Sequence, residues 1–390
     1  MRIHPAMAGT EAPPVMEARR WIDGVTFPDT RPLLNVSQAA PVDPPPKELR
    51  AAIARFALDE PQAHLYGPVL GLVRLREQIA SDWSVAYGGS VTTDDVAITS
   101  GCNQAFAAAM STLAGAGDEV ILPTPWYFNH KMWLDMSGVH AVPLPCGDGM
   151  VPDAVAAAAL ITDKTRAIVL VTPNNPTGAE YPAGVVRAFY DLCAARGIAL
   201  VVDETYRDFH SQGGAPHDLF TDPDWRETLI QLYSFSKAYR LTGHRVGALV
   251  ASPRRLAEVE KFLDTVAICA NQLGQMAALW GMQNLKEWLA GERIEILARR
   301  AAIEQEVATM PGWEVMGVGA YFTYLKHPYD MASNVLARRL VGDASVLALP
   351  GTMFTPEGDA LGARSLRIAF ANIGVGEIGE LAARLRTLTL

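Results

Sequence analysis

One lysine of this sequence stands among residues that suit covalent chemistry at an amine. Lys237 follows Ser234 and Ser236, and Arg245 comes eight positions later, in the pattern S-F-S-K-x-Y-x-x-x-G-x-R-x-G. A lysine amine adds to a carbonyl group and forms an imine, while small hydroxyl groups and a guanidinium can hold a phosphate group nearby. Because most lysines are solvated surface charges, this interpretation needs further groups from other parts of the chain.

Two apolar segments predict buried parallel strands that deliver such groups. Residues 166–171 lead into an N-P-T-G sequence that begins at Asn175, and residues 198–202 lead into D-E-x-Y, which begins at Asp203. The amphipathic helix expected between them, at 185–193, completes a β-α-β unit. Ligands collect at the carboxyl ends of such strands, which makes both polar residues candidates. A turn-forming asparagine and a helix-capping aspartate are the structural alternatives.

Two more strands are predicted to end in site-forming turns. After the strand expected at 96–99, the residues Gly101, Cys102 and Asn103 begin a helix, whose free N–H groups and dipole favour an anion. A plain strand-to-helix turn is the alternative. After the strand expected at 119–122 come two aromatic residues that can stack on a flat ring, Tyr127 and its competitor Trp126.

Together these motifs resemble the class I/II pyridoxal-phosphate-dependent aminotransferases, which are similar to aspartate aminotransferase and have fold type I. The run Y-G-P-x-x-G-x-x-x-L-R-x-x-I, which begins at Tyr66, resembles the same family. The resemblance extends from about residue 30 to about residue 375 and implies an α/β fold. It implies a large domain at 46–290 with a mainly parallel central sheet. It also implies a smaller α+β domain, which consists of residues 291–390 together with residues 1–45, and the latter form a proline-rich strap.

The resemblance implies a role for each candidate residue. The expected catalytic residues are Lys237, which anchors pyridoxal phosphate (PLP) and moves a proton, Asp203, which keeps the pyridine nitrogen protonated, and Tyr206. The expected cofactor-binding residues are Lys237, Gly101, Cys102, Asn103, Tyr127, Asn175, Asp203, Tyr206, Ser234, Ser236, Arg245 and Tyr66. In the family this last tyrosine reaches the cofactor phosphate of the neighbouring subunit, which implies a homodimer.

The expected substrate-binding residues are Arg367, Asn175, Ala39 and Tyr127. Arg367 is the one arginine of an apolar strand predicted at 366–371, and an arginine there needs a carboxylate partner. In the family this partner is the substrate α-carboxylate. The alternative is a carboxylate of the protein itself, in a structural salt bridge. Ala39 stands where the family often has glycine, so its methyl group narrows the pocket. No second arginine for an acidic substrate side chain is identified, which favours neutral or aromatic amino acids.

Composition limits the other classes of function. The net charge is −9 without a basic run, which argues against a nucleic-acid surface. The four cysteines are scattered without a C-x-x-C pair, which favours free thiols in the cytoplasm and no metal site. The longest apolar segments have the length of strands, well below the roughly 20 residues of a membrane helix.

The sequence therefore predicts an aminotransferase that moves an amino group from an L-amino acid to a 2-oxo acid through the PLP and pyridoxamine-phosphate forms of the cofactor. A PLP-dependent carbon–sulfur β-lyase that acts on cysteine conjugates is the alternative, because it uses the same cofactor residues. A transcription regulator with an aminotransferase-like domain is disfavoured, since no helix-turn-helix pattern precedes the resemblance.

Overall fold

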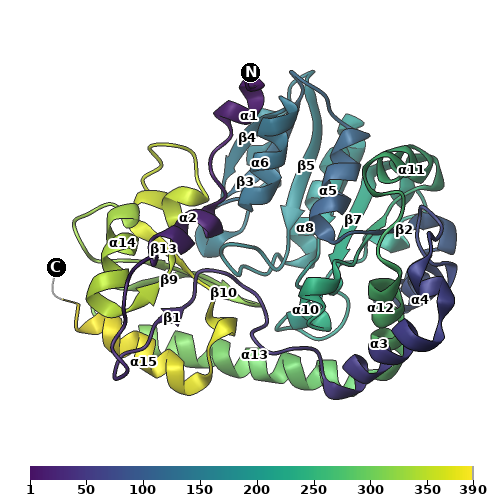
Figure 1. Cartoon of the computed structure of the whole chain (residues 1–390). Helices are drawn as coiled ribbons and strands as arrows, with labels where there is room; N and C mark the ends of the chain where they lie inside the picture. The colour runs from purple at the N-terminus through teal and green to yellow at the C-terminus, as the bar shows by residue number, and fades with distance from the viewer. Residues whose placement is uncertain (389–390) are drawn as a thin grey trace.

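The computed structural model describes residues 1–388 and arranges them as two sheet-centred regions joined by a long helix (Figure 1). The helices are α1 (Pro5–Gly9), α2 (Pro14–Arg20), α3 (Lys47–Asp59), α4 (Val73–Tyr87), α5 (Cys102–Ser111), α6 (Phe128–Ser137), α7 (Ala154–Leu160), α8 (Ala183–Arg196), α9 (Trp225–Thr228), α10 (Phe235–Ala238), α11 (Pro253–Ala267), α12 (Gln272–Asn284), α13 (Lys286–Val307), α14 (Ser333–Ala344) and α15 (Val375–Arg386). The strands are β1 (Leu34–Asn35), β2 (Val96–Thr99), β3 (Glu119–Thr124), β4 (His140–Pro145), β5 (Thr165–Val171), β6 (Ala199–Asp203), β7 (Leu229–Ser234), β8 (Gly247–Val250), β9 (Glu314–Gly319), β10 (Phe322–Lys326), β11 (Val346–Leu347), β12 (Leu349–Pro350) and β13 (Ser365–Ile368).

The larger sheet has seven strands in the order β2-β8-β7-β6-β5-β3-β4, and only β8 runs against its neighbours. Its central strands are buried on both faces, because helices cover both sides of the sheet (Figure 1). This explains why their sequences are continuous apolar runs rather than alternating ones. The mainly parallel sheet predicted from the sequence is confirmed.

The smaller sheet is antiparallel, in the order β12-β13-β10-β9, and α14 and α15 belong to the same apolar core. The N-terminal strap is held to this region by β1, whose Leu34 and Asn35 pair in parallel with Val346 and Leu347 of β11. The predicted domain boundary at residue 291 falls inside α13, which runs continuously through it. The boundaries of the two domains therefore stay predictions.

Most of the helices and strands expected near the motifs are present, with small shifts at their ends. The strand expected at 366–371 ends at Ile368, and a short 3-10 turn follows it. The sequence interpretation did not assign α6, β4, α7, β7 or α15, nor the short helices α1 and α2 inside the strap.

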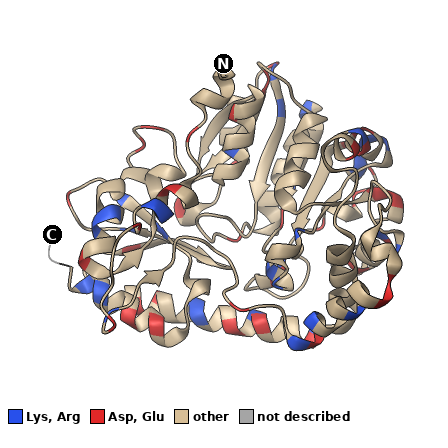
Figure 2. Cartoon of the chain, viewed as in Figure 1, with Lys and Arg blue, Asp and Glu red and all other residues tan. Residues whose placement is uncertain are grey.

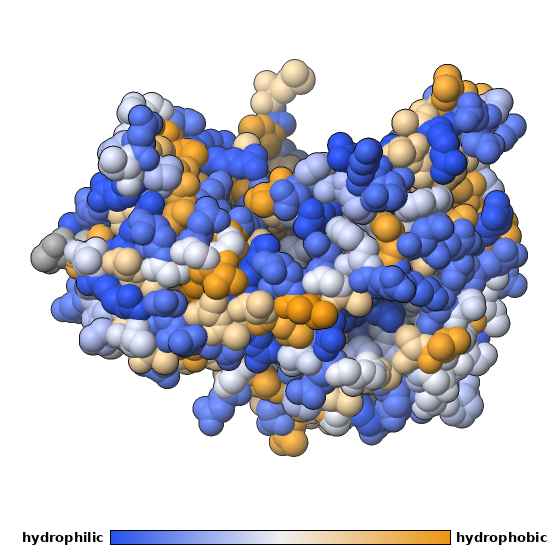
Figure 3. Space-filling view, turned by 90° about the horizontal axis from the view of Figure 1, so that it is seen from below, coloured by the Kyte–Doolittle hydropathy of each residue, from blue (hydrophilic) through white to orange (hydrophobic). Residues whose placement is uncertain are grey.

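Charged residues of both signs follow one another along α13, which Figure 2 shows as blue and red segments of the ribbon. Figure 3 views the molecule from below and shows apolar side chains scattered among hydrophilic ones on that face. One of the exposed apolar side chains is Ile294 of α13, which is 67% exposed. No helix of the described residues combines the length and apolar character that crossing a membrane requires.

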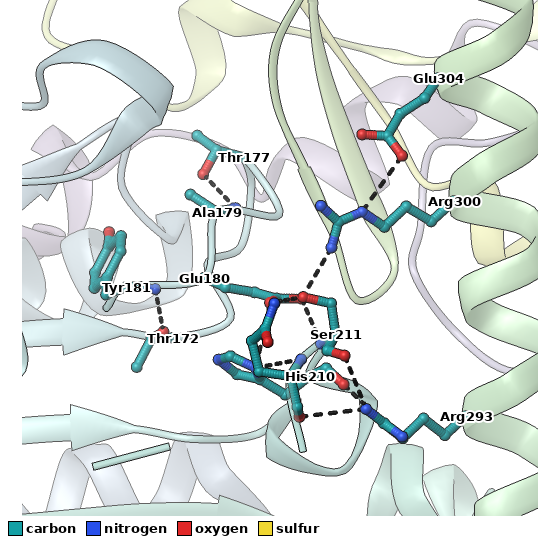
Figure 4. A network of polar contacts seen from close by, with 11 residues as sticks. Thr172, Thr177, Ala179, Glu180, Tyr181, His210, Ser211, Arg293, Arg300 and Glu304 are labelled. Carbon is teal, nitrogen blue, oxygen red and sulfur yellow. Dashed lines mark hydrogen bonds and ion pairs between the residues drawn. The ribbon is translucent and has the colours of Figure 1, made fainter. Parts of the chain in front are cut away.

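A polar network ties α13 to the loops that follow β5 and β6 (Figure 4). At its centre Glu180 accepts hydrogen bonds from the Ser211 backbone N–H, at 2.9 Å, and from the Ser211 hydroxyl. The carboxylate also lies 3.2 Å from Arg300 Nη1 and 3.2 Å from His210 Nδ1. Arg293 of α13 donates to the carbonyl oxygens of His210, at 2.7 Å, and of Ser211, at 3.0 Å. The loops that carry the N-P-T-G and D-E-x-Y motifs are thus fixed to one helix.

We expect Glu180→Gln to lower the free energy of unfolding by about 1–3 kcal/mol, because the change removes the charge that the Ser211 N–H, the Ser211 hydroxyl and the Arg300 guanidinium share. Urea denaturation measures this difference. Glu304→Gln is the matched control, since Glu304 pairs with the same Arg300 at 3.6 Å but is 43% exposed, and an exposed pair contributes roughly 0–1 kcal/mol. Equal effects of the two substitutions would contradict the central place given to Glu180.

Candidate active site

The predicted site residues meet in a cavity of about 420 Å³. It lies where β5, β6 and β7 end, and residues of the N-terminal segment and of β13 complete its wall. The lining residues include Ala39, Cys102, Asn103, Tyr127, Asn175, Asp203, Tyr206, Ser234, Ser236, Lys237, Arg245 and Arg367. Of the residues expected from the sequence, Gly101 and Tyr66 do not line it.

Lys237 projects into this cavity from α10, the four-residue helix that follows β7. The Ser234 hydroxyl caps the helix by accepting a hydrogen bond from the Ser236 backbone N–H at 3.2 Å. The Lys237 amine donates a hydrogen bond to the carbonyl oxygen of Ala39. Burial, with the positive charges of Arg245 and Arg367, lowers the pKa of the Lys237 amine to about 7. A large fraction of this amine is therefore neutral, and nucleophilic, near neutral pH.

Arg245 and the start of α5 form one end of the cavity. Arg245 Nη1 donates to the Ser236 hydroxyl at 3.3 Å and to the Thr242 carbonyl at 3.1 Å. Gly101 caps α5 with a φ of +85°, and a side chain there would collide with the Arg245 guanidinium. Gly101 thus contributes by leaving room for the arginine. Within the described residues Arg245 forms no ion pair, so its charge is available to an anion.

Asp203 is the last residue of β6 and is 3% exposed. One carboxylate oxygen accepts a hydrogen bond from the Thr205 N–H at 3.0 Å, and the other lies 3.3 Å from His130 Nε2. Burial acts to raise the pKa of Asp203, but the interactions with His130 and Thr205 outweigh it and hold the pKa below its usual value. The side chain is therefore a carboxylate at neutral pH. It caps no helix, so the structural alternative for this residue is wrong.

The sequence interpretation missed His130. This residue lies on α6, is 2% exposed, and stacks on Phe106 of α5 with ring centroids 3.8 Å apart. Its ring nitrogen faces Asp203, which makes it the residue that orients this carboxylate. The sequence feature that could have identified His130 is its position three residues after Tyr127. The sequence pattern did not predict the helix α6 on which it lies.

Arg367 is 2% exposed, and its guanidinium lies about 5 Å from the rings of Phe322 and Phe354. It donates to the Ser37 carbonyl oxygen and, at 3.3 Å, to Asn175 Oδ1, while its Nε has no hydrogen-bond partner. Burial lowers its pKa to about 10, so it stays charged near neutral pH. No carboxylate of the described residues pairs with it. The alternative of a structural salt bridge is therefore wrong.

The aromatic candidates occupy different positions. Tyr127 lines the cavity and donates a hydrogen bond to Asn103 Oδ1 at 3.3 Å, whereas Trp126 is buried and does not line the cavity. The Tyr206 ring lies 6.0 Å from the Lys237 amine, and burial raises the pKa of its hydroxyl well above the usual value. Tyr66 is 78% exposed and outside the cavity. Its expected role across an interface stays a prediction.

The fold and the cavity define an α/β enzyme whose site combines one reactive amine, a buried carboxylate and two guanidinium groups that pair with no carboxylate of the described residues. The sequence matches the family described as "Aminotransferase class I and II" over residues 31–385. The chain belongs to this family, has its type I fold, and is an aminotransferase.

Relatives from several organisms carry aminotransferase names. The aromatic aminotransferase ISS1 of Arabidopsis thaliana is 27% identical over 97% of this chain and 94% of its own length. The valine–pyruvate aminotransferase of Mycobacterium tuberculosis is 30% identical, over 91% of this chain and 90% of its own length. The solved aspartate aminotransferase of Thermus thermophilus with maleate shares the fold, with a TM-score of 0.89, 22% identity and 99% of both chains covered. These names do not favour the carbon–sulfur lyase.

In protein without bound ligand, we expect the Lys237 amine to react with an amine-selective acylating reagent with a midpoint near pH 7. Peptide mass spectrometry across a pH series measures this midpoint. Lys261 is the internal control, because its side chain is 72% exposed and its labelling follows the reactivity of the reagent toward an amine in water. Arg245→Met should move the Lys237 midpoint upward, since it removes a nearby positive charge. Labelling of both lysines with the same midpoint would contradict the assignment.

Proposed function

We propose that this aminotransferase binds PLP in the cavity and uses Lys237 as the residue that holds it. The family uses this cofactor, and the donors of the cavity fit its groups. Arg245, Ser234, Ser236 and the start of α5 suit a phosphate. The buried Asp203 suits a protonated ring nitrogen, and the neutral fraction of the Lys237 amine suits an aldehyde.

When bound, the cofactor supplies an electron-accepting ring that stabilises negative charge at the substrate Cα. Asp203, oriented by His130, keeps a negative charge beside that ring. Arg367 and Asn175 hold the substrate carboxylate, and this fixes the direction of the Cα–H bond. The Lys237 amine, once free, takes the Cα proton and returns it, as expected of a base whose pKa lies near the working pH. Tyr206 and Tyr127 border the same space.

The observation that carries the proposal is the unpaired state of Arg367 among the described residues. A buried guanidinium normally has a carboxylate partner, because burying an uncompensated charge costs several kcal/mol. Arg367 instead has two neutral acceptors and an Nε without a partner. An amino acid or a 2-oxo acid brings an α-carboxylate that satisfies this group. Both classes of substrate share that carboxylate, so one arginine serves both halves of the reaction.

We also propose a homodimer in which Tyr66 reaches the cavity of the partner. The proposal is supported by a group of exposed apolar side chains that includes Tyr66 (78% exposed) and two others, Leu65 (56%) and Ile268 (40%). A hydrogen bond from Gly67 N to Cys269 Sγ, at 3.4 Å, joins their two segments. Grouped apolar side chains at a surface are typical of an interface. A cytoplasmic location, without nucleic-acid or membrane partners, completes the proposal.

For the cofactor, we expect borohydride reduction of PLP-treated protein to leave a stable adduct on Lys237, found by peptide mass spectrometry. Lys237→Ala should give no adduct and reduce kcat by at least about a hundredfold, since it removes both the anchor and the base. Lys261→Ala is the control and should behave as the wild type. An adduct on another lysine, with Lys237 unmodified, would refute the proposal.

For the dimer, we expect two defective variants to complement each other. When Tyr66→Ala and Lys237→Ala chains are co-expressed with different tags, the hybrid dimer contains one site with both native residues, if Tyr66 acts across the interface. The purified hybrid should then be more active than either parent dimer. Activity no higher than the mean of the parents would mean that Tyr66 acts within its own subunit or not at all.

A further inference from the structure

Two side chains of the cavity bind the same short stretch of the N-terminal strap. Arg367 donates to the carbonyl oxygen of Ser37, and Lys237 donates to the carbonyl oxygen of Ala39. The two acceptor residues are one position apart and both are buried. The importance of this stretch rests on the proposed function, in which the lysine moves a proton and the arginine holds the substrate carboxylate. Residues 37–40 then set where both groups lie before a ligand arrives.

The backbone of residues 37–40 receives no direct support from the two sheets. Up to residue 40 of the strap, the last backbone–backbone hydrogen bonds to other segments are those of Val36, whose N–H and carbonyl oxygen bond to backbone next to β11 and β13, each at 2.9 Å. Within residues 1–388, the hydrogen bonds from other segments to the backbone of 37–40 come from three side chains, namely Lys237, Arg367 and Asn372.

Asn372 is the one of these three that the proposed chemistry leaves in place. Its side-chain nitrogen donates to the carbonyl oxygens of Asn35, at 3.2 Å, and of Gln38. Its Oδ1 accepts a hydrogen bond from the Ala40 N–H at 3.3 Å. One amide thus binds the strap on either side of both acceptor residues. The lysine and the arginine exchange their partners when a ligand binds, so they cannot fix the strap by themselves.

Asn372 can hold the strap because its own turn is anchored. It ends the 3-10 turn Phe370–Asn372, which follows β13, the strand that carries Arg367. Arg299 of α13 donates to the carbonyl oxygen of Ala371, in the same turn, at 2.6 Å. The strand that presents the arginine and the amide that fixes the acceptor of this arginine are therefore held together against α13.

We propose that Asn372 is a positioning residue of the active site, which fixes this stretch of the strap so that its carbonyl oxygens meet Lys237 and Arg367. Asn372 does not line the cavity, so it acts through the strap and not on a bound ligand. Since both carbonyl oxygens belong to residues 37–40, one displacement of this stretch removes the acceptors of both side chains.

The pH midpoint of Lys237 acylation, in protein without bound ligand, tests the proposal. Asn372→Leu keeps the approximate volume of the side chain, changes no charge and removes all three hydrogen bonds to the strap. A carbonyl acceptor favours the charged form of an amine, so its loss should lower the midpoint by about 0.5–1 pH unit. A merely structural loosening would instead admit water and move the midpoint upward, because the desolvation of the amine would decrease. An upward movement would therefore overturn the proposal, as would no movement.

Arg31→Met is the matched control. Arg31 Nη1 donates to the carbonyl oxygen of Asp343 in α14 at 3.0 Å, so it also ties the strap to another segment, but four residues before Asn35. This variant should leave the midpoint unchanged. An equal shift in the control would mean that any loosening of the strap has the same effect, and would refute the role of Asn372.

Two further variants of the same residue complete the series. Asn372→Gln keeps the amide group and should recover part of the shift. Asn372→Ala introduces no larger side chain and should repeat the shift, so the test stays decisive if the leucine variant does not fold. A shift in the glutamine variant as large as that in the alanine variant would contradict the role given to the amide.

Turnover gives a second readout. With the amino acid that the wild type converts fastest, kcat/KM of PLP-loaded Asn372→Leu should fall about tenfold, because displaced reacting groups lose their orientation. Arg31→Met should stay within about twofold. Wild-type kcat/KM in Asn372→Leu would refute the proposal. The labelling experiment needs no cofactor, so if borohydride left no adduct on Lys237 the proposed function would fail, while the midpoints would still decide the role of Asn372.

Discussion

The constraint on which the rest of the structure depends is the concentration of positive charge in one buried cavity. The same space is lined by Lys237, Arg245 and Arg367. Burial, together with the positive charges of the two arginines, lowers the pKa of the lysine to about 7. Such a grouping is costly unless polar atoms surround it. Here most of those atoms are carbonyl oxygens, from Ser37, Ala39 and Thr242. The chain stabilises these cations with neutral acceptors, since within the described residues the one carboxylate of the wall, Asp203, pairs with His130 instead.

These acceptors and the cations that they bind come from different segments of the chain, so the fold must hold those segments together. The carbonyl oxygens of Ser37 and Ala39 belong to the N-terminal strap, whereas Lys237 follows β7 and Arg367 lies on β13. The pairing of β1 with β11 holds the strap in place, and the polar network around Glu180 holds the loops after β5 and β6 against α13. The site thus consists of segments that are distant in the sequence, and the two sheets and α13 hold them in fixed relative positions.

Sequence reasoning found the parts of the site that adjoin strand ends or short motifs. Asn175, Asp203 and Lys237 each follow a continuous apolar run or stand in a distinctive pattern, so their meeting at the carboxyl edge of the sheet was predictable. His130 was not found. It lies on a helix that carries no clear apolar period, and it acts through its contact with Asp203, which is far away in the sequence. The strap was recognised by its prolines, but nothing in its composition indicates which of its residues face the cavity.

The neutral partners also explain how one cavity can exchange two substrates. If Arg367 were paired with a carboxylate of the protein, a substrate would have to break a desolvated ion pair, and breaking such a pair costs about 3–5 kcal/mol. An amide or carbonyl oxygen is displaced at a smaller cost, because a neutral hydrogen bond contributes about 1 kcal/mol net. The incoming carboxylate then gains the stronger interaction. The same argument makes a bound 2-oxo acid easy to replace by the next substrate, since its departure returns the Arg367 guanidinium to the Ser37 carbonyl oxygen that the strap already provides.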